Sequence, residues 1–163
     1  MSKVSFKKIG GVALILASLG LAGSALAAQA TGDAKATVLT PIAIEKGQEL
    51  NFGVFSAPTA GTVVISSGGA RSQTGGVVLV GTGGQQGTFT VTGTGTQTFG
   101  ITYPGSVNLS NGSETMALLV TGASSGALTG GTATINVGGT LTVGANQAAG
   151  EYTGTYTMTV EYN

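Results

Sequence analysis

Apolar and polar side chains alternate with a period of two along the last part of the chain. A period of two is that of a β-strand, whose successive side chains point to opposite faces of a sheet. The apolar face carries Tyr152, Tyr156, Met158, Val160 and Tyr162, and the other face carries threonine and glutamate. Gly154 interrupts the apolar face, which indicates a bulge or the close approach of another backbone. The pattern predicts one long strand over residues 151–162 with a buried and a solvated face.

Short runs rich in valine, isoleucine, threonine and phenylalanine recur through the preceding sequence, separated by clusters of glycine, serine and asparagine. No window has apolar residues sustained at helical spacing, so strands are expected throughout. Asn111-Gly112 is typical of a primed hairpin turn. The remaining predicted strands are Ala36–Ile44, Glu49–Phe52, Thr62–Ser66, Val77–Val80, Thr88–Thr92, Thr98–Tyr103, Met116–Thr121, Thr132–Val137 and Thr140–Val143. Such regular spacing predicts an all-β sandwich or barrel.

A weaker alternation covers residues 28–38. Its apolar positions hold small side chains, namely Ala28, Ala30, Gly32, Ala34, Ala36 and Val38, and polar residues stand between them. Side chains of this size bury little area, so the segment is not expected to be a central strand of its own domain. Two interpretations stay open: a frayed tail, or an extended arm that docks into a groove on another molecule.

The first residues have the three parts of a secretory signal peptide. Lys3, Lys7 and Lys8 give a basic start, an uncharged apolar run follows to Ala22, and Ala25-Leu26-Ala27 fits the cleavage pattern. The apolar run has about 14 residues, whereas a membrane-spanning helix needs about 20. We therefore predict a leader over 1–27 that is cleaved between Ala27 and Ala28, with no membrane span in the mature chain. The predicted location is the periplasm, followed by the cell surface or the medium.

Composition excludes several classes of function. The chain contains 30 glycines, no cysteine and no histidine. It therefore has no disulfide, no Ser-His-Asp triad and no zinc site of the usual ligands. The chain after the leader carries three basic residues against six acidic ones, a net charge of −3. This charge gives no electrostatic reason to bind nucleic acid or an anionic membrane.

The remaining candidate chemistry is sparse. Glu45 and Glu49 flank Lys46-Gly47, where a solvated turn is a better interpretation than a metal or acid–base pair. No aspartate-rich calcium loop and no phosphate-binding loop is present. Tyr103, Tyr152 and Tyr156 could stack on sugar rings, although tyrosine in a β-sandwich is more often part of the core. We expect no enzymatic activity and no cofactor.

Three stretches together resemble a known group of bacterial proteins. They are Ala36-Thr37-Val38 through Pro41-Ile42 to Leu50-Asn51-Phe52-Gly53, the run Gly138–Val143, and the run Gly150–Tyr162 with its two tyrosine–threonine repeats. Over residues 28–163 the chain resembles an uncharacterised family of secreted β-sandwich proteins related to the spore coat protein U domain. That domain is in turn similar to subunits of archaic chaperone–usher pili.

The resemblance implies an immunoglobulin-like β-sandwich that lacks one strand, which a neighbouring subunit donates. It further implies a periplasmic chaperone and an outer-membrane usher as partners, besides other copies of the chain. Carried over by position, the donor strand would include Ala30, Gly32, Ala34, Ala36 and Val38. The strand facing the chaperone or the groove would include Tyr152, Tyr156, Met158, Val160 and Tyr162. The sandwich domain would then span residues 39–163.

The leading hypothesis is accordingly a structural subunit of a secreted fibre, pilus or coat that assembles by strand donation. The alternative is a monomeric secreted binding module or adhesin for glycans or surfaces. A complete sandwich, in which Ala36–Ile44 forms the first strand internally and leaves no groove, is a third arrangement.

Overall fold

The computed structural model describes residues 27–163, so the predicted leader lies outside the described residues except for Ala27. The chain divides into two units, Met1–Ala36 and Thr37–Asn163. In the first unit, the described residues 27–36 have no regular secondary structure, and all their side chains are exposed. The second unit contains all the strands.

The described residues form twelve strands and no helix, which confirms the all-β prediction. All strand pairs are antiparallel, in sheets of seven, three and two strands. The strands are β1 (Ala43–Lys46), β2 (Val54–Ser56), β3 (Gly61–Ile65), β4 (Arg71–Gly75), β5 (Val78–Val80), β6 (Gly87–Thr92), β7 (Thr98–Thr102), β8 (Ser106–Ser110), β9 (Thr115–Gly122), β10 (Ser125–Ala127), β11 (Thr132–Val143) and β12 (Thr159–Tyr162). Within residues 27–163 there is no helical segment of the length and apolarity needed to cross a membrane.

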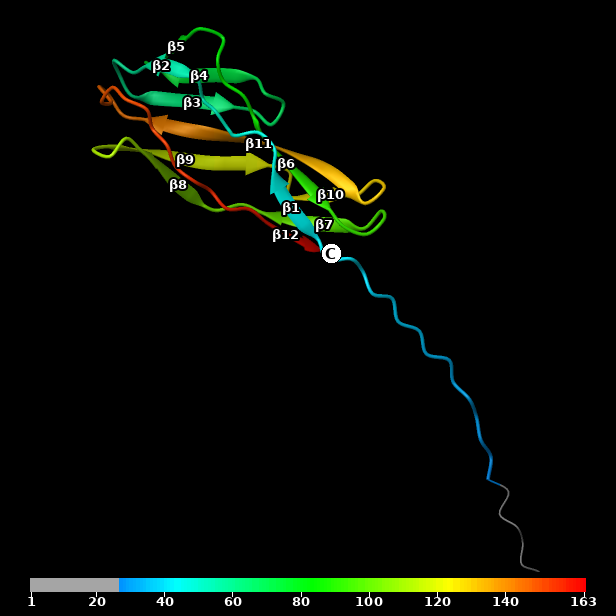
Figure 1. Ribbon diagram of the computed structural model, residues 1–163. Helices are drawn as coiled ribbons and strands as arrows, with labels where there is room; N and C mark the ends of the chain where they lie inside the picture. The colour runs from blue at the N-terminus through cyan, green and yellow to red at the C-terminus, as the bar shows by residue number, and fades with distance from the viewer. Residues whose placement is uncertain (1–26) are drawn as a thin grey trace, which may run out of the picture. The chain divides into compact units, whose positions relative to one another are not determined.

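β11 is the central strand of the largest sheet, as Figure 1 shows. Its first half, Thr132–Val137, pairs with β6, and its second half pairs with β3 on one edge and β9 on the other. The sequence predicted two separate strands here, and that prediction is wrong. Gly138 and Gly139 do not end the strand because β9 pairs with both and β3 pairs with Gly139. The backbone of Ser66 and Ser67 lies directly over Gly138.

The second layer is the sheet β10-β7-β12, which packs against β1, β6 and the first half of β11. β7–β8 and β9–β10 together form one long hairpin whose register stays constant from the Ser110–Thr115 pair to the Thr98–Ala127 pair. This hairpin joins both layers. The apolar residues between the layers form one core, in which Val63, Ile65, Val91, Phe99, Leu118, Leu128, Val137, Leu141 and Val143 are the most deeply buried.

The C-terminal strand is shorter than the alternation predicted. Only Thr159–Tyr162 pairs as a strand, and Thr153 makes an isolated bridge to Ser110. The neighbouring hairpin carries Tyr103-Pro104-Gly105 between β7 and β8. Proline has no amide hydrogen to give to a ladder, so pairing stops there and resumes at Ser110. The predicted alternation of buried and exposed side chains is confirmed nonetheless, because it persists through the unpaired stretch.

Other predicted boundaries also shift. The strand predicted over Ala36–Ile44 begins only at Ala43, two residues beyond Pro41. The strand predicted over Glu49–Phe52 is wrong, because this stretch makes only an isolated bridge between Asn51 and Gln85.

The sequence missed four strands altogether. One is β2, Val54–Ser56, which lies just beyond the predicted strand Glu49–Phe52. β4, β8 and β10 are dominated by polar and small residues, and they are held mainly by pairing with a neighbouring strand.

The β8–β9 turn also differs from the predicted two-residue hairpin turn. Its loop comprises the four residues 111–114, and only Gly112 has a positive φ, of 95°. The side-chain oxygen of Asn111 accepts the amide hydrogens of Ser113 and Glu114, which caps the loop from within.

Candidate strand-accepting edge

The C-terminal segment 153–162 forms one edge of the second layer. Asn163 donates its amide hydrogen to the carbonyl of Thr98 on β7. Main-chain groups point to alternate sides of a strand, so those of Val160 and Tyr162 point away from β7. Within the part of the chain that the structure describes, β12 pairs with no second strand. These main-chain groups are therefore open to an added strand.

The stretch 154–158 beside β12 is also open. Among residues 27–163, its amides and carbonyls have no hydrogen-bond partner. Its side chains nevertheless continue the alternation, with Met158 buried and Tyr156 half-buried. A segment whose side chains are packed while its main-chain groups are unpaired is what a sheet edge presents to another chain. Sequence reasoning did not find this feature; the signal for it was Pro104 in the neighbouring hairpin.

The five residues predicted for this strand do different things. Met158 and Val160 belong to the buried core. Tyr156 packs edge-on against Phe89 with ring centroids 6.0 Å apart. Burial raises the pKa of the Tyr156 phenol, and the neighbouring Tyr103 raises it further. Tyr152 lies outside the edge, because its hydroxyl donates to the carbonyl of Ala148 and anchors the loop before the segment.

Gly154 marks a close approach, as the sequence indicated. A Cβ at this position would lie 2.6 Å from the carbonyl oxygen of Asn108 and 2.9 Å from the side chain of Leu109. Only glycine therefore lets the segment lie this close to β8, which fixes where the open stretch begins.

Tyr162 connects the end of the chain to the start of the domain. Its hydroxyl donates to the carbonyl oxygen of Thr40 and accepts the amide hydrogen of Thr94, each at 2.8 Å. The amide of Thr40 in turn donates to the side-chain oxygen of Thr94. The tyrosine thus holds the residues that precede β1 beside β12, at the open edge.

Replacing Tyr162 by phenylalanine should loosen these residues. The change leaves the amide of Thr94 without its partner and should cost about 1–2 kcal/mol of unfolding free energy. Amide hydrogen exchange at residues 40–44 should become faster, while exchange in β3 and β11 should not change. Tyr103→Phe is the matched control, because among the described residues the Tyr103 hydroxyl bonds only the carbonyl of Ala123. Unchanged exchange at 40–44 would show that Tyr162 does not hold this segment.

The predicted donor residues lie in the stretch 28–38, which pairs with no strand in the described part of the chain. Ala30, Gly32, Ala34, Ala36 and Val38 are all exposed, and so are the polar residues between them. Ala27 and Ala28, at the predicted cleavage site, are exposed as well. The arm interpretation and the tail interpretation both stay predictions.

A separate cavity of about 430 Å³ lies between β10 and β11. β9 and β11 pair up to Gly122 and Val137, and the chain bridges again at Thr129–Thr132, so β10 and β11 are separated between these two points. Gly126, Ala133 and Asn136 are among its lining residues, and none of the residues predicted for the groove strand lines it.

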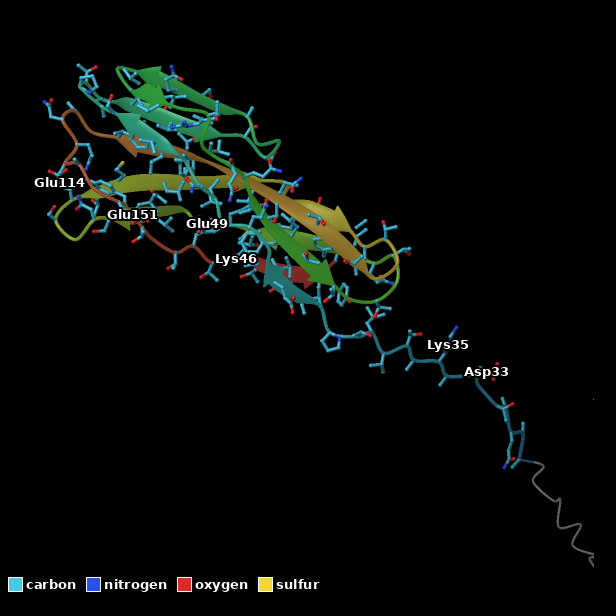
Figure 2. All side chains as sticks on the ribbon, turned by 45° about the horizontal axis from the view of Figure 1, so that its top comes forward. Asp33, Lys35, Lys46, Glu49, Glu114 and Glu151 are labelled. Carbon is cyan, nitrogen blue, oxygen red and sulfur yellow. The ribbon has the colours of Figure 1, made fainter. Side chains whose placement is uncertain are left out.

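Charged groups form no reactive cluster in residues 27–163. No three acidic residues there come together as metal ligands would. Glu45 and Lys46 lie in β1 rather than in the predicted turn, and Figure 2 shows Glu49 apart from Glu114. Glu114 accepts hydrogen bonds from the side chain of Gln147 and the amide of Ala148, so it holds a loop.

The comparison with known proteins identifies a family and nothing more specific. The chain matches no curated protein and no solved structure. Residues 42–162, which run from just before β1 to the end of β12, match the family described as a domain of unknown function (DUF4402). The chain therefore belongs to this family, and the matched range contains the whole strand-accepting edge while leaving out residues 28–38.

Proposed function

We propose that this protein is a structural subunit of a secreted surface fibre or coat, and that copies join by β-strand donation. Residues 28–38 of one copy add to the edge 153–162 of the next. By the resemblance noted above, a periplasmic chaperone and an outer-membrane usher would handle the subunits before assembly. The observation that carries the proposal is the stretch 154–158, whose side chains are packed while its main chain has no partner in the described part of the chain.

The two segments agree in length. The eleven residues 28–38 would span about 36 Å as a strand, and the ten residues 153–162 about 33 Å, at about 3.3 Å per residue. The arm can thus cover the edge from end to end.

The arm would bind mainly through its backbone. Its alternate positions carry alanine and glycine, which bury little apolar area, so the side chains contribute a small part of the affinity. Each ladder hydrogen bond contributes about 0.5–1.5 kcal/mol, and five or more form along such an edge. Strand addition of this kind takes its affinity from main-chain hydrogen bonds and its register from alternate side chains.

Deleting residues 28–37 should abolish assembly and leave the domain folded. The full-length protein, expressed with export to the periplasm, should give a ladder of oligomers in SDS gels that collapses on heating. The deletion variant should run as a monomer and keep the β circular dichroism spectrum and cooperative thermal unfolding. A ladder that survives the deletion would exclude the arm as donor.

A matched pair of substitutions tests the register of the arm. Ala34→Glu places a charge on the face that would turn toward the core, and should remove the ladder, because an unpaired charge is costly to bury. Lys35→Glu introduces the same side chain on the solvated face and should leave the ladder intact. Equal loss from both variants would contradict an alternating, strand-like arm, and a full-length protein that is a stable monomer would favour a binding module.

A further inference from the structure

The two-stranded sheet β2–β5 presents an exposed apolar surface. Val54 pairs directly with Val80, and Ser56 pairs directly with Val78, so these four side chains share one face. The three valines are 66%, 53% and 51% exposed in the order Val54, Val78, Val80. Phe55 and Leu79, on the other face, pack against the core. We call Val54, Val78 and Val80 the valine face.

The valine face is held in place by an arginine of the neighbouring large sheet. Arg71, the single arginine of the chain, donates hydrogen bonds from its guanidinium to the carbonyls of Val54 and Val80. Desolvation lowers the pKa of this guanidinium. One side chain from β4 thus ties both strands of the small sheet to the large sheet. The valine face therefore has a fixed position on the domain.

A fourth exposed valine lies at the other end of the domain. Val38 is 94% exposed and precedes the residues that Tyr162 holds beside β12. Figures 1 and 2 both show β2 and β5 at one end of the domain, and β1 and β12 toward the end where the chain enters it. Four of the five large apolar side chains that are exposed in residues 27–163 therefore lie at two opposite ends.

We propose that the valine face packs head-to-tail against the end of the adjacent copy from which its arm leaves, beside β1 and β12, in the assembled fibre. This inference rests on the proposed function, because the donated arm brings the two ends together. An arm that runs antiparallel to 153–162 has its root at the Thr153 end of the acceptor, away from β12. The donor domain that follows the arm then meets the end of the acceptor where the amide of Asn146 donates to the carbonyl of Ala57, directly after β2.

The size of the valine face favours a tethered copy over a free partner. A stable interface between separate proteins buries about 1,200–2,000 Å² in total, far more than three half-exposed valines provide. A neighbour already joined by its arm has a high effective concentration and needs only a small additional contact. The contact is heterologous, with different surfaces on the two copies, which is the kind that extends into filaments.

Charge does not oppose this contact. β2 and β5 carry no charged side chain. At the opposite end, β1 and β12 carry Glu45, Lys46 and Glu161, a net charge of −1. An uncharged valine face thus meets an end of low net charge.

The test replaces all three valines of the face by threonine. Threonine keeps the β-branched shape and strand propensity, so the domain should fold as before. Leu119→Thr is the matched control, because Leu119 is the remaining exposed large apolar residue and lies on β9. The readouts are the length distribution of the SDS-resistant ladder and the protein concentration at which assembly begins, both measured on full-length protein.

The triple variant should still form oligomers, but its ladder should shift toward the shortest ones. The protein concentration at which assembly begins should rise about tenfold. The control should assemble as the unmodified protein does. If the triple variant assembles like the control, the head-to-tail contact is excluded while strand donation stands. If deletion of 28–37 removes the ladder and the triple variant assembles normally, strand donation stands and the head-to-tail contact is excluded. If the ladder survives the deletion, the proposed strand donation is itself excluded.

Discussion

Replacing Phe99 by alanine should lower the free energy of unfolding by about 3–5 kcal/mol, the range for losing a buried aromatic ring. Phe99 is 1% exposed and lies on β7, between β10 and β12. A Cβ at Gly126 would lie 2.6 Å from the ring, so the backbone of β10 rests directly on it. The loss is a large part of the roughly 5–15 kcal/mol that stabilises a typical domain.

Chemical denaturation followed by circular dichroism measures this effect. Leu119→Ala is the control, because the same kind of truncation at an exposed position should change the stability by less than about 0.5 kcal/mol. If Phe99→Ala is too unstable to purify, Phe99→Leu should show a smaller loss in the same direction. A loss at Phe99 no larger than at Leu119 would mean that β7 is not the centre of the second layer.

Replacing Gly138 by alanine should cost about 1–3 kcal/mol, in spite of the small size of the added methyl group. Gly138 lies where β11 changes from pairing with β6 to pairing with β3 and β9. The added Cβ would fall on the carbonyl oxygen of Ile65 and lie 2.8 Å from backbone atoms of both Ser66 and Ser67. Backbone cannot move aside as the end of a side chain can, so the strands must separate.

Gly105→Ala is the control for this substitution. A Cβ at Gly105 meets nothing within 4 Å, and neither glycine has a positive φ. The two variants therefore differ in the space around the methyl group and not in backbone strain. Equal stability of the two proteins in urea would show that β11 does not pass under the Ser66–Ser67 backbone.

The open edge and the valine face both expose groups that monomeric proteins usually cover. Natural sheets protect their edges with charges, prolines or bulges. Along 153–162 the one charged residue is Glu161, whose main-chain groups point toward β7 rather than the free side. This lack of protection supports the proposed donation of a strand to this edge.

Local patterns were enough to predict the all-β class and most of the strands. Alternation identified which side chains of 151–162 are buried, because burial depends on the side of the strand on which a residue lies. The same pattern gave the wrong length for the paired strand. Pairing depends on the neighbour, and Pro104 in that neighbour interrupts the ladder.

The polar strands were beyond prediction for a related reason. β4, β8 and β10 carry few apolar residues, and their extended form comes from hydrogen bonds to β3, β9 and β7. β-Propensity depends strongly on context, so such segments resemble loops until their partners are known.

By itself the sequence determined the strand-rich class, the absence of thiol and imidazole chemistry, and the inward face of the last segment. Each of these follows from residue type or from local periodicity. The tertiary structure alone decided that 154–158 has no main-chain partner within residues 27–163, that β11 continues through two glycines, and that three valines share one exposed face. These features depend on which distant segments meet, and no local pattern encodes that register.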